Sequence, residues 1–76
     1  MSEDREVVAS RERGGTLRRD VIWRKCHDRR GVPQRELQGL TSHWALGAWL
    51  PAPEFETFAS EIDAIAWLDG PWPTLH

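Results

Sequence analysis

The tripeptide Cys26-His27-Asp28 contains a thiol, an imidazole and a carboxylate, which are three groups that enzymes use in nucleophilic catalysis. In an extended chain, neighbouring side chains point to opposite faces, so Cys26 and His27 diverge. A nucleophile needs its base within hydrogen-bond distance. His43 on the third predicted strand could approach Cys26 in space, but nothing in the sequence indicates that it does. The sequence therefore predicts that Cys26 is a small, half-buried apolar residue and not a nucleophile.

The other residues capable of chemistry form no familiar catalytic or metal-binding motif. The three histidines (His27, His43 and His76) and the one cysteine lack the spacings H-x-x-x-H, C-x-x-C and H-E-x-x-H. The glycines form no phosphate-binding loop, and a chain of 76 residues is short for an enclosed pocket. We expect no enzymatic activity, no metal and no other cofactor.

The charged residues are unevenly distributed. Residues 1–38 hold ten basic and seven acidic side chains, a net charge of +3, whereas residues 39–76 hold five acidic and no basic side chains, a net charge of −5. A predicted hairpin over residues 18–35 carries seven basic residues: Arg18, Arg19, Arg24, Lys25, Arg29, Arg30 and Arg35. Such a ribbon can follow a nucleic-acid backbone while Trp23 stacks on bases. The pI of about 5.9 and the interleaved acids argue against this, so nucleic-acid binding is our second hypothesis.

The stretch Pro53–Asp69 has the pattern of an amphipathic helix. One face carries apolar residues with a period near 3.6: Phe55, Phe58, Ala59, Ile62, Ile65 and Ala66. Pro53 suits the first helical position, and Gly70-Pro71 suits the end. A later start is the alternative, with Ser60 as N-cap and Asp63 three residues on, which leaves residues 54–59 extended. The periodicity favours the earlier start.

Three strands are predicted before this helix. Residues 16–28 form the first, Asp28–Gly31 a turn, and residues 32–38 a second strand that Pro33 restricts to an edge. After a break at Gly39, the third strand covers Leu40–Leu50. The expected fold is α+β, a three-stranded antiparallel sheet with one C-terminal helix packed on one face (β-β-β-α). Residues 1–15 are expected to be a flexible charged tail with partial helicity, and residues 16–76 a single small domain.

The tryptophans indicate what such a domain binds. In the third strand, Trp44 would face the helix and Trp49 the far face, with Trp23 either beside Trp49 or paired with Trp44. An uncovered far face would be a partner or dimer interface, unless the chain ends cover it. Trp67 points away from the helix stripe, so it either packs against residues 71–76 or anchors a partner.

The first hypothesis is therefore a small non-enzymatic protein-binding module. Tryptophan and arginine are enriched at binding hot spots. The expected anchors are Trp67, Trp49, Trp72 and Trp23, with Arg29 and Arg30 as steering charges. The partner would be another protein, or a second copy in a homodimer.

Composition also bears on the compartment. The sequence contains no apolar run near the roughly 18 residues of a membrane span. One cysteine cannot form an intramolecular disulfide, which suits a reducing compartment. We expect a cytoplasmic protein without a membrane partner.

The size, the tryptophan content and the segment A-I-A-W-L-D-G after the strand region resemble small orphan accessory proteins of actinobacteria and their phages. The nine arginines against one lysine suggest a genome of high GC content. The resemblance covers Trp44–Gly70 and implies a modulator of a host enzyme or regulator. It implies no particular site residues.

Overall fold

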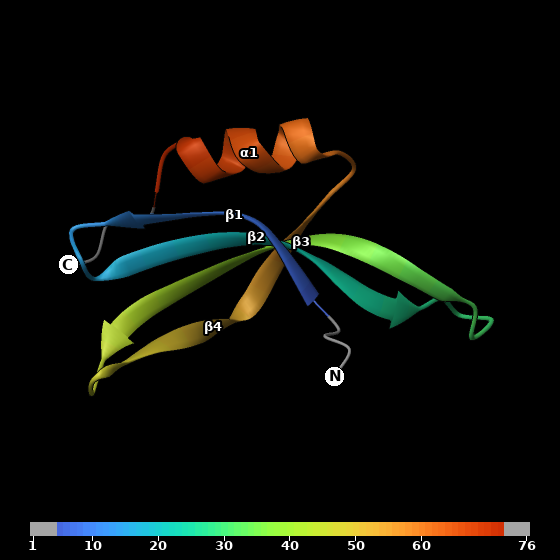
Figure 1. The fold of residues 1–76 in the computed structure, drawn as a ribbon, viewed down its shortest axis with the longest axis horizontal. Helices are drawn as coiled ribbons and strands as arrows, with labels where there is room; N and C mark the ends of the chain where they lie inside the picture. Colours follow the sequence, from blue (N-terminus) through green and yellow to red (C-terminus); the bar gives the residue numbers. More distant parts are fainter. Residues whose placement is uncertain (1–4, 73–76) are drawn as a thin grey trace.

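The structure, a computed structural model, describes residues 5–72 and contains four strands and one helix. The elements, in chain order, are β1 (Arg5–Arg13), β2 (Leu17–His27), β3 (Pro33–Ala45), β4 (Ala48–Phe58) and α1 (Glu61–Asp69). The strands form one antiparallel sheet in the order β1-β2-β3-β4. Figure 1 shows strongly twisted strands that fan out from a common crossing region, with α1 along one side. The β2–β3 and β3–β4 hairpins therefore project as two separate arms.

The predicted three-stranded sheet is wrong, because the sheet has four strands. The additional strand is β1, which lies in the segment expected to be a charged tail. It pairs with β2 from Arg5 opposite Arg24 to Arg13 opposite Leu17. Charged residues have low strand propensity but are tolerated at a sheet edge, where one side of the strand faces solvent. The pairing with β2 supplies the stabilisation that local propensity lacks.

The predicted third strand is also divided between two strands. β3 passes through Gly39 without a break, and the chain reverses at Leu46-Gly47. Both residues have positive φ, 54° and 78°, as a tight hairpin turn requires. This turn places Trp44 opposite Trp49, whereas Trp23 lies opposite Leu37. The expected separation of Trp44 and Trp49 onto different faces is therefore wrong.

The helix begins at Glu61 and not at Pro53, because β4 continues to Phe58. Ser60 is the N-cap, and its Oγ accepts a hydrogen bond from the Asp63 N–H at 3.2 Å. The later start, considered as the alternative from the sequence, is confirmed. Phe55 consequently lies in β4 opposite Leu40, and the apolar stripe from Phe55 does not exist as a helix face.

The turn after β2 is confirmed. The Asp28 Oδ1 accepts hydrogen bonds from the backbone N–H groups of Arg30 and Val32 at 2.8 and 2.9 Å, and Gly31 has a φ of 79°. An acceptor side chain at the first position and a glycine with positive φ are the local features that define this turn. Residues 29–32 need no tertiary contact to form it.

The core lies between α1 and one face of the sheet. Val21 and Leu37 from the sheet pack against Ala64 and Leu68 from the helix. Partly buried residues surround this cluster: Val8, Ala9, Trp23, Phe58, Ile65 and Trp67. Ile62 is 82% exposed, so the helix buries a different face from the one predicted.

Replacing the cap residue should loosen the helix at its start. We expect Ser60→Ala to lower the free energy of unfolding by about 1 kcal/mol, because the Asp63 N–H loses its acceptor. Urea unfolding followed by tryptophan fluorescence measures this loss. Ser60→Asp is the matched control, since a carboxylate accepts the same bond, and a Ser60→Ala protein as stable as wild type would contradict the assignment of the cap.

Candidate functional site

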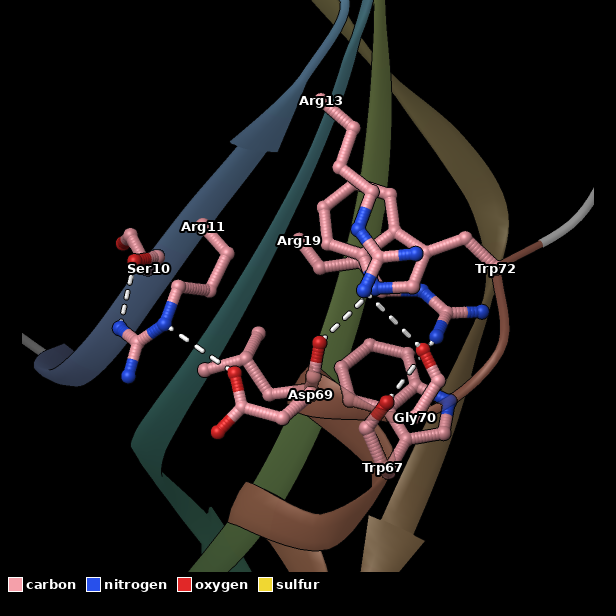
Figure 2. A network of polar contacts seen from close by, with 9 residues as sticks. Ser10, Arg11, Arg13, Arg19, Trp67, Asp69, Gly70 and Trp72 are labelled. Atoms are coloured by element: carbon pink, nitrogen blue, oxygen red, sulfur yellow. Dashed lines mark hydrogen bonds and ion pairs between the residues drawn. The ribbon is translucent and has the colours of Figure 1, made fainter.

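Three arginines from the β1–β2 hairpin bind the C-terminal end of α1 (Figure 2). Arg11 Nε lies 3.2 Å from Asp69 Oδ1, and an Arg13 Nη donates to the Gly70 carbonyl at 3.3 Å. Arg19 Nη1 donates to the carbonyls of Trp67 and Pro71 at 3.1 and 3.3 Å. The last helical turn contains no basic residue of its own. These arginines therefore provide the positive charge that stabilises the negative end of the helix dipole.

Two tryptophans alternate with two of these arginines in a stack. The Arg19 guanidinium carbon lies 4.2 Å from the centroid of Trp67 and 5.2 Å from that of Trp72, and the Arg13 guanidinium carbon lies 4.6 Å from the centroid of Trp72. Trp72 also donates its indole N–H to the Leu68 carbonyl at 2.8 Å. We call Arg13, Trp72, Arg19 and Trp67 the Arg–Trp stack. It places Trp67 and Trp72, both expected as partner anchors, in intramolecular packing.

Arg19 is the most buried charged residue of the stack, with 8% of its surface exposed. Burial, and then the nearby charge of Arg13, lower the pKa of the Arg19 guanidinium, whereas Glu56 raises it. The guanidinium carries its charge at neutral pH because its reference pKa is so high. This arginine, expected on a nucleic-acid surface, is therefore a buried link between β2 and α1.

Two further members of the predicted basic hairpin have intramolecular partners. Arg18 pairs with Asp20 at 3.1 Å, and Arg35 pairs with Glu6 at 2.6 Å while lying 5.2 Å from the ring of Trp23. The Trp23 indole N–H donates to Glu61 at 3.4 Å. The remaining four basic residues make no ion pair among residues 5–72 and occupy the β2–β3 arm: Arg24, Lys25, Arg29 and Arg30.

These four residues do not form one basic face. Opposite residues of an antiparallel pair share a face, and successive residues alternate. Arg24 follows the face of Ile22, whereas Lys25 follows the face of Val21, on which α1 lies. Arg29 and Arg30 lie at the turn and are exposed. The structure thus divides the basic hairpin between two faces and the arm tip.

The face of the sheet opposite α1 has an apolar centre. Ile22 is buried there, with 1% of its surface exposed, while Val7 and Phe55 on the outer strands are 58% and 49% exposed. The register places Val7 opposite Ile22, and Phe55 opposite Leu40. We call this surface the open face, since the helix of the described region lies on the other side. The exposed apolar side chains therefore lie on the two outer strands, on either side of the buried Ile22, and such side chains on a sheet face indicate an interaction surface.

The open face continues into the β3–β4 arm, residues 41–53, which contains no Asp, Glu, Lys or Arg. Trp44 and Trp49 contact each other edge to face, with ring centroids 5.3 Å apart, and Arg18 lies 6.0 Å from the Trp49 ring. Trp44 is 47% exposed, and Leu46 at the tip is 99% exposed. The sequence placed Trp44 against the helix because the turn at Leu46-Gly47 was missed. The sequence feature that could have predicted this arm is the uncharged run from Leu37 to Pro53, which contains Gly47 at the position of the turn.

Shallow hollows accompany these surfaces, and two of them contain residues considered above. One, of about 250 Å³, lies beside the stack between Arg19, Trp67, Glu54 and Glu56. The other, of about 400 Å³, lies on the β2–β3 arm and includes Cys26 and His27. Cys26 lies opposite Gln34, nine positions along β3 from His43, or about 30 Å in an extended strand. The fold therefore keeps the thiol and the His43 imidazole apart.

Metal-ligating side chains do not gather in the part of the chain that the structure describes. Residues 5–72 contain no group of three or more His, Cys, Asp or Glu side chains placed to hold a metal ion. Within the same residues, no helix is long and apolar enough to cross a membrane.

Comparison with protein-family models, with curated proteins and with solved structures finds no match to this chain. Its candidate sites therefore rest on the physical properties of its own residues.

Proposed function

We propose that this protein is a non-enzymatic, cytoplasmic binding module that inserts the β3–β4 arm into an apolar pocket of another protein. The observation that supports this proposal is an uncharged arm whose tip exposes 99% of Leu46 and 47% of Trp44. The exposed surface of these side chains adds nothing to the stability of the isolated chain, because it stays in contact with water. A partner that covers them gains about 25 cal/mol for each Å² of apolar surface removed from water.

The backbone at the arm tip supports the same proposal. Leu46 has a φ of 54°, a left-handed conformation that costs a residue with a side chain roughly 1 kcal/mol. Asparagine tolerates this conformation, and Asn-Gly is the preferred pair for such a hairpin turn. A leucine here is both strained and fully solvated, which suits a residue retained for contact with a partner.

The arm also indicates the chemistry of the partner. With no charged residue between Leu37 and Pro53, the arm has no charge to match against an acidic or basic surface. It suits an uncharged pocket that receives Leu46, flanked by flat apolar walls for the Trp44–Trp49 pair. The resemblance to actinobacterial and phage accessory proteins would make the owner of that pocket a host enzyme or regulator.

The backbone strain at Leu46 leads to a prediction that does not depend on any partner. We expect Leu46→Asn to raise the free energy of unfolding by about 1 kcal/mol, because asparagine adopts the left-handed conformation more readily. Urea unfolding measures the change. A lower stability would show that Leu46 contributes to folding and would remove the argument from strain.

Substitutions at the tip of the arm test binding, and urea unfolding of each variant first shows that it is folded, because Trp44 packs on Trp49. The wild-type chain, Trp44→Ser/Leu46→Asn and Arg24→Glu/Arg29→Glu/Arg30→Glu are immobilised and exposed to a host lysate, with and without nuclease. We expect wild type and the arginine variant to retain a protein that the arm variant loses, whatever the nuclease treatment. Titration of the purified partner should then show at least a tenfold loss of affinity for the arm variant, as hot-spot removal predicts.

Two outcomes would overturn the proposal. Capture that is the same for the arm variant and wild type would show that the arm is not the binding surface. Capture that nuclease abolishes, and that the arginine variant lacks, would make the ligand a nucleic acid held by the β2–β3 arm.

A further inference from the structure

We propose that two copies of this chain associate by antiparallel pairing of their β1 strands, which joins their sheets into one of eight strands. This inference concerns a different surface from the β3–β4 arm and does not depend on the protein partner proposed above. It rests on the position of β1 in the sheet, on the order of charges along it and on an irregularity in its pairing.

Strand β1 is an edge of the sheet with one side of its backbone unpaired among the described residues. Unpaired N–H and C=O groups at an edge are a template for another strand. The opposite edge, β4, contains Pro51 and Pro53, which lack an N–H. Strand β1 contains no proline over its nine residues. The sheet therefore has one edge suited to a further strand and one that is not.

The charges along β1 are complementary to those of a second β1 that runs in the opposite direction. When the two strands are centred between Val8 and Ala9, the register places Arg5 opposite Glu12 of the second copy. In the same register, Glu6 lies opposite Arg11. A two-fold axis repeats each pair, so the interface has four opposite-charge pairs and no like-charge pair in these positions.

A bulge in β1 makes this register geometrically consistent. In a regular strand, Arg5 and Glu12 would lie on opposite faces, because side chains alternate and these residues are seven apart. In the structure, the pairing with β2 passes from Val7 opposite Ile22 directly to Ala9 opposite Val21, so Val8 is an extra residue. The extra residue shifts the alternation by one.

After this shift, each expected pair lies on one face. Arg5 and Glu12 are opposite Arg24 and Arg18 of β2, which both belong to the open face. Glu6 and Arg11 are opposite Trp23 and Arg19, which both belong to the face covered by α1. The bulge lies at the centre of the charge pattern, where a two-fold axis would pass. The position of the bulge and the charge order thus agree on one register.

The existing contacts of β1 are compatible with this assembly. Glu6 pairs with Arg35, and Arg11 with Asp69, both on the helix side and both exposed to solvent. A second copy would extend these pairs into a network. Glu12 has no ion pair within residues 5–72, so Arg5–Glu12 pairs on the open face would be new in the dimer.

Charge reversal provides a sharp test, with sedimentation velocity over a range of protein concentrations as the measurement. We expect the wild-type chain to dimerise, and Arg5→Glu and Glu12→Arg each to raise the dimer dissociation constant about tenfold or more, since each variant creates two like-charge pairs. An equimolar mixture of the two variants should associate again, because each supplies the charge that the other needs. The double variant Arg5→Glu/Glu12→Arg should dimerise like wild type.

The matched control is Arg29→Glu, a charge reversal of the same size at the tip of the β2–β3 arm, which should leave dimerisation unchanged. Recovery in the mixture also shows that both single variants fold. A wild-type chain that remains monomeric at millimolar concentration would overturn the proposal. Association that neither reversal weakens would overturn it equally, by placing the dimer interface elsewhere.

Discussion

Arg19→Met is expected to lower the free energy of unfolding by about 3 kcal/mol, the largest effect of any polar substitution that we predict here. The stability of a chain of this length is about 4 to 11 kcal/mol, so this one change would remove a large part of it. The reason lies in what the guanidinium contacts. Arg19 donates to two carbonyls at the end of α1 and lies between the rings of Trp67 and Trp72.

The methionine side chain could fill the space between the two rings, so the loss does not come from a cavity. It comes from the carbonyls of Trp67 and Pro71, which lose their hydrogen-bond donor when the guanidinium is removed. Hydrogen bonds to a charged group contribute about 1.5–3 kcal/mol each, and a cation–π contact about 0.5–2 kcal/mol. Since these contributions share one side chain, we expect less than their total.

Urea unfolding with circular dichroism and tryptophan fluorescence measures this change. Arg19→Lys should recover only part of the stability, because an ammonium group has no planar surface to lie between two indoles. Arg24→Met, at an exposed arginine without an ion pair in the described residues, is the control and should change stability by less than about 0.5 kcal/mol. Equal stability of Arg19→Met and wild type would refute the role of Arg19 in holding the helix.

Gly39→Ala is expected to destabilise the protein by about 2 kcal/mol, although alanine normally stabilises a strand relative to glycine. A Cβ on Gly39 would lie 2.7 and 2.9 Å from ring atoms of Trp67 and 2.8 Å from a ring atom of Phe58. These two rings pack together between β3, β4 and α1, with centroids 5.4 Å apart. The methyl group would therefore push the helix away from the sheet.

A double-mutant cycle with Trp67→Leu separates this steric cause from a backbone effect. Trp67→Leu alone should be destabilising, but Gly39→Ala should cost much less in its presence, because the smaller side chain leaves room for the methyl group. Gly47→Ala is the matched control. Its Cβ would meet no atom within 4 Å, and its cost comes from a φ of 78°, so Trp67→Leu should not change it. Additive effects of Gly39→Ala and Trp67→Leu would contradict the packing argument.

Local features of the sequence were sufficient for some elements of this fold. The turn after β2 could be predicted because the Asp28 side chain and Gly31 define it without help from the rest of the chain. The Ser60–Asp63 cap was also visible as an alternative start of the helix. In both cases, the interacting groups lie within four residues of each other, so the pattern in the sequence is the interaction itself.

The choice between the two helix starts required the rest of the sheet. Phe55 and Phe58 have helical spacing with Ile62, but pairing with Leu40 and Leu37 holds residues 55–58 in β4. The hydrogen bonds and side-chain contacts of a strand involve residues far away in the chain, so periodicity within one segment does not reveal them. For the same reason, β1 could not be predicted from its own segment, because its charged sequence forms a strand only by pairing with β2.

The arginines show most clearly the difference between what the sequence determines and what the tertiary structure determines. The sequence alone establishes how many arginines there are and that all of them lie in the first half of the chain. It does not decide whether their side chains contact solvent, a nucleic acid or other parts of the protein. Only the tertiary structure brings Arg11, Arg13 and Arg19 to the end of a helix about 50 residues later in the chain. A guanidinium has the same charge in every setting, whereas the acceptors and aromatic rings around it are set by the packing of distant segments.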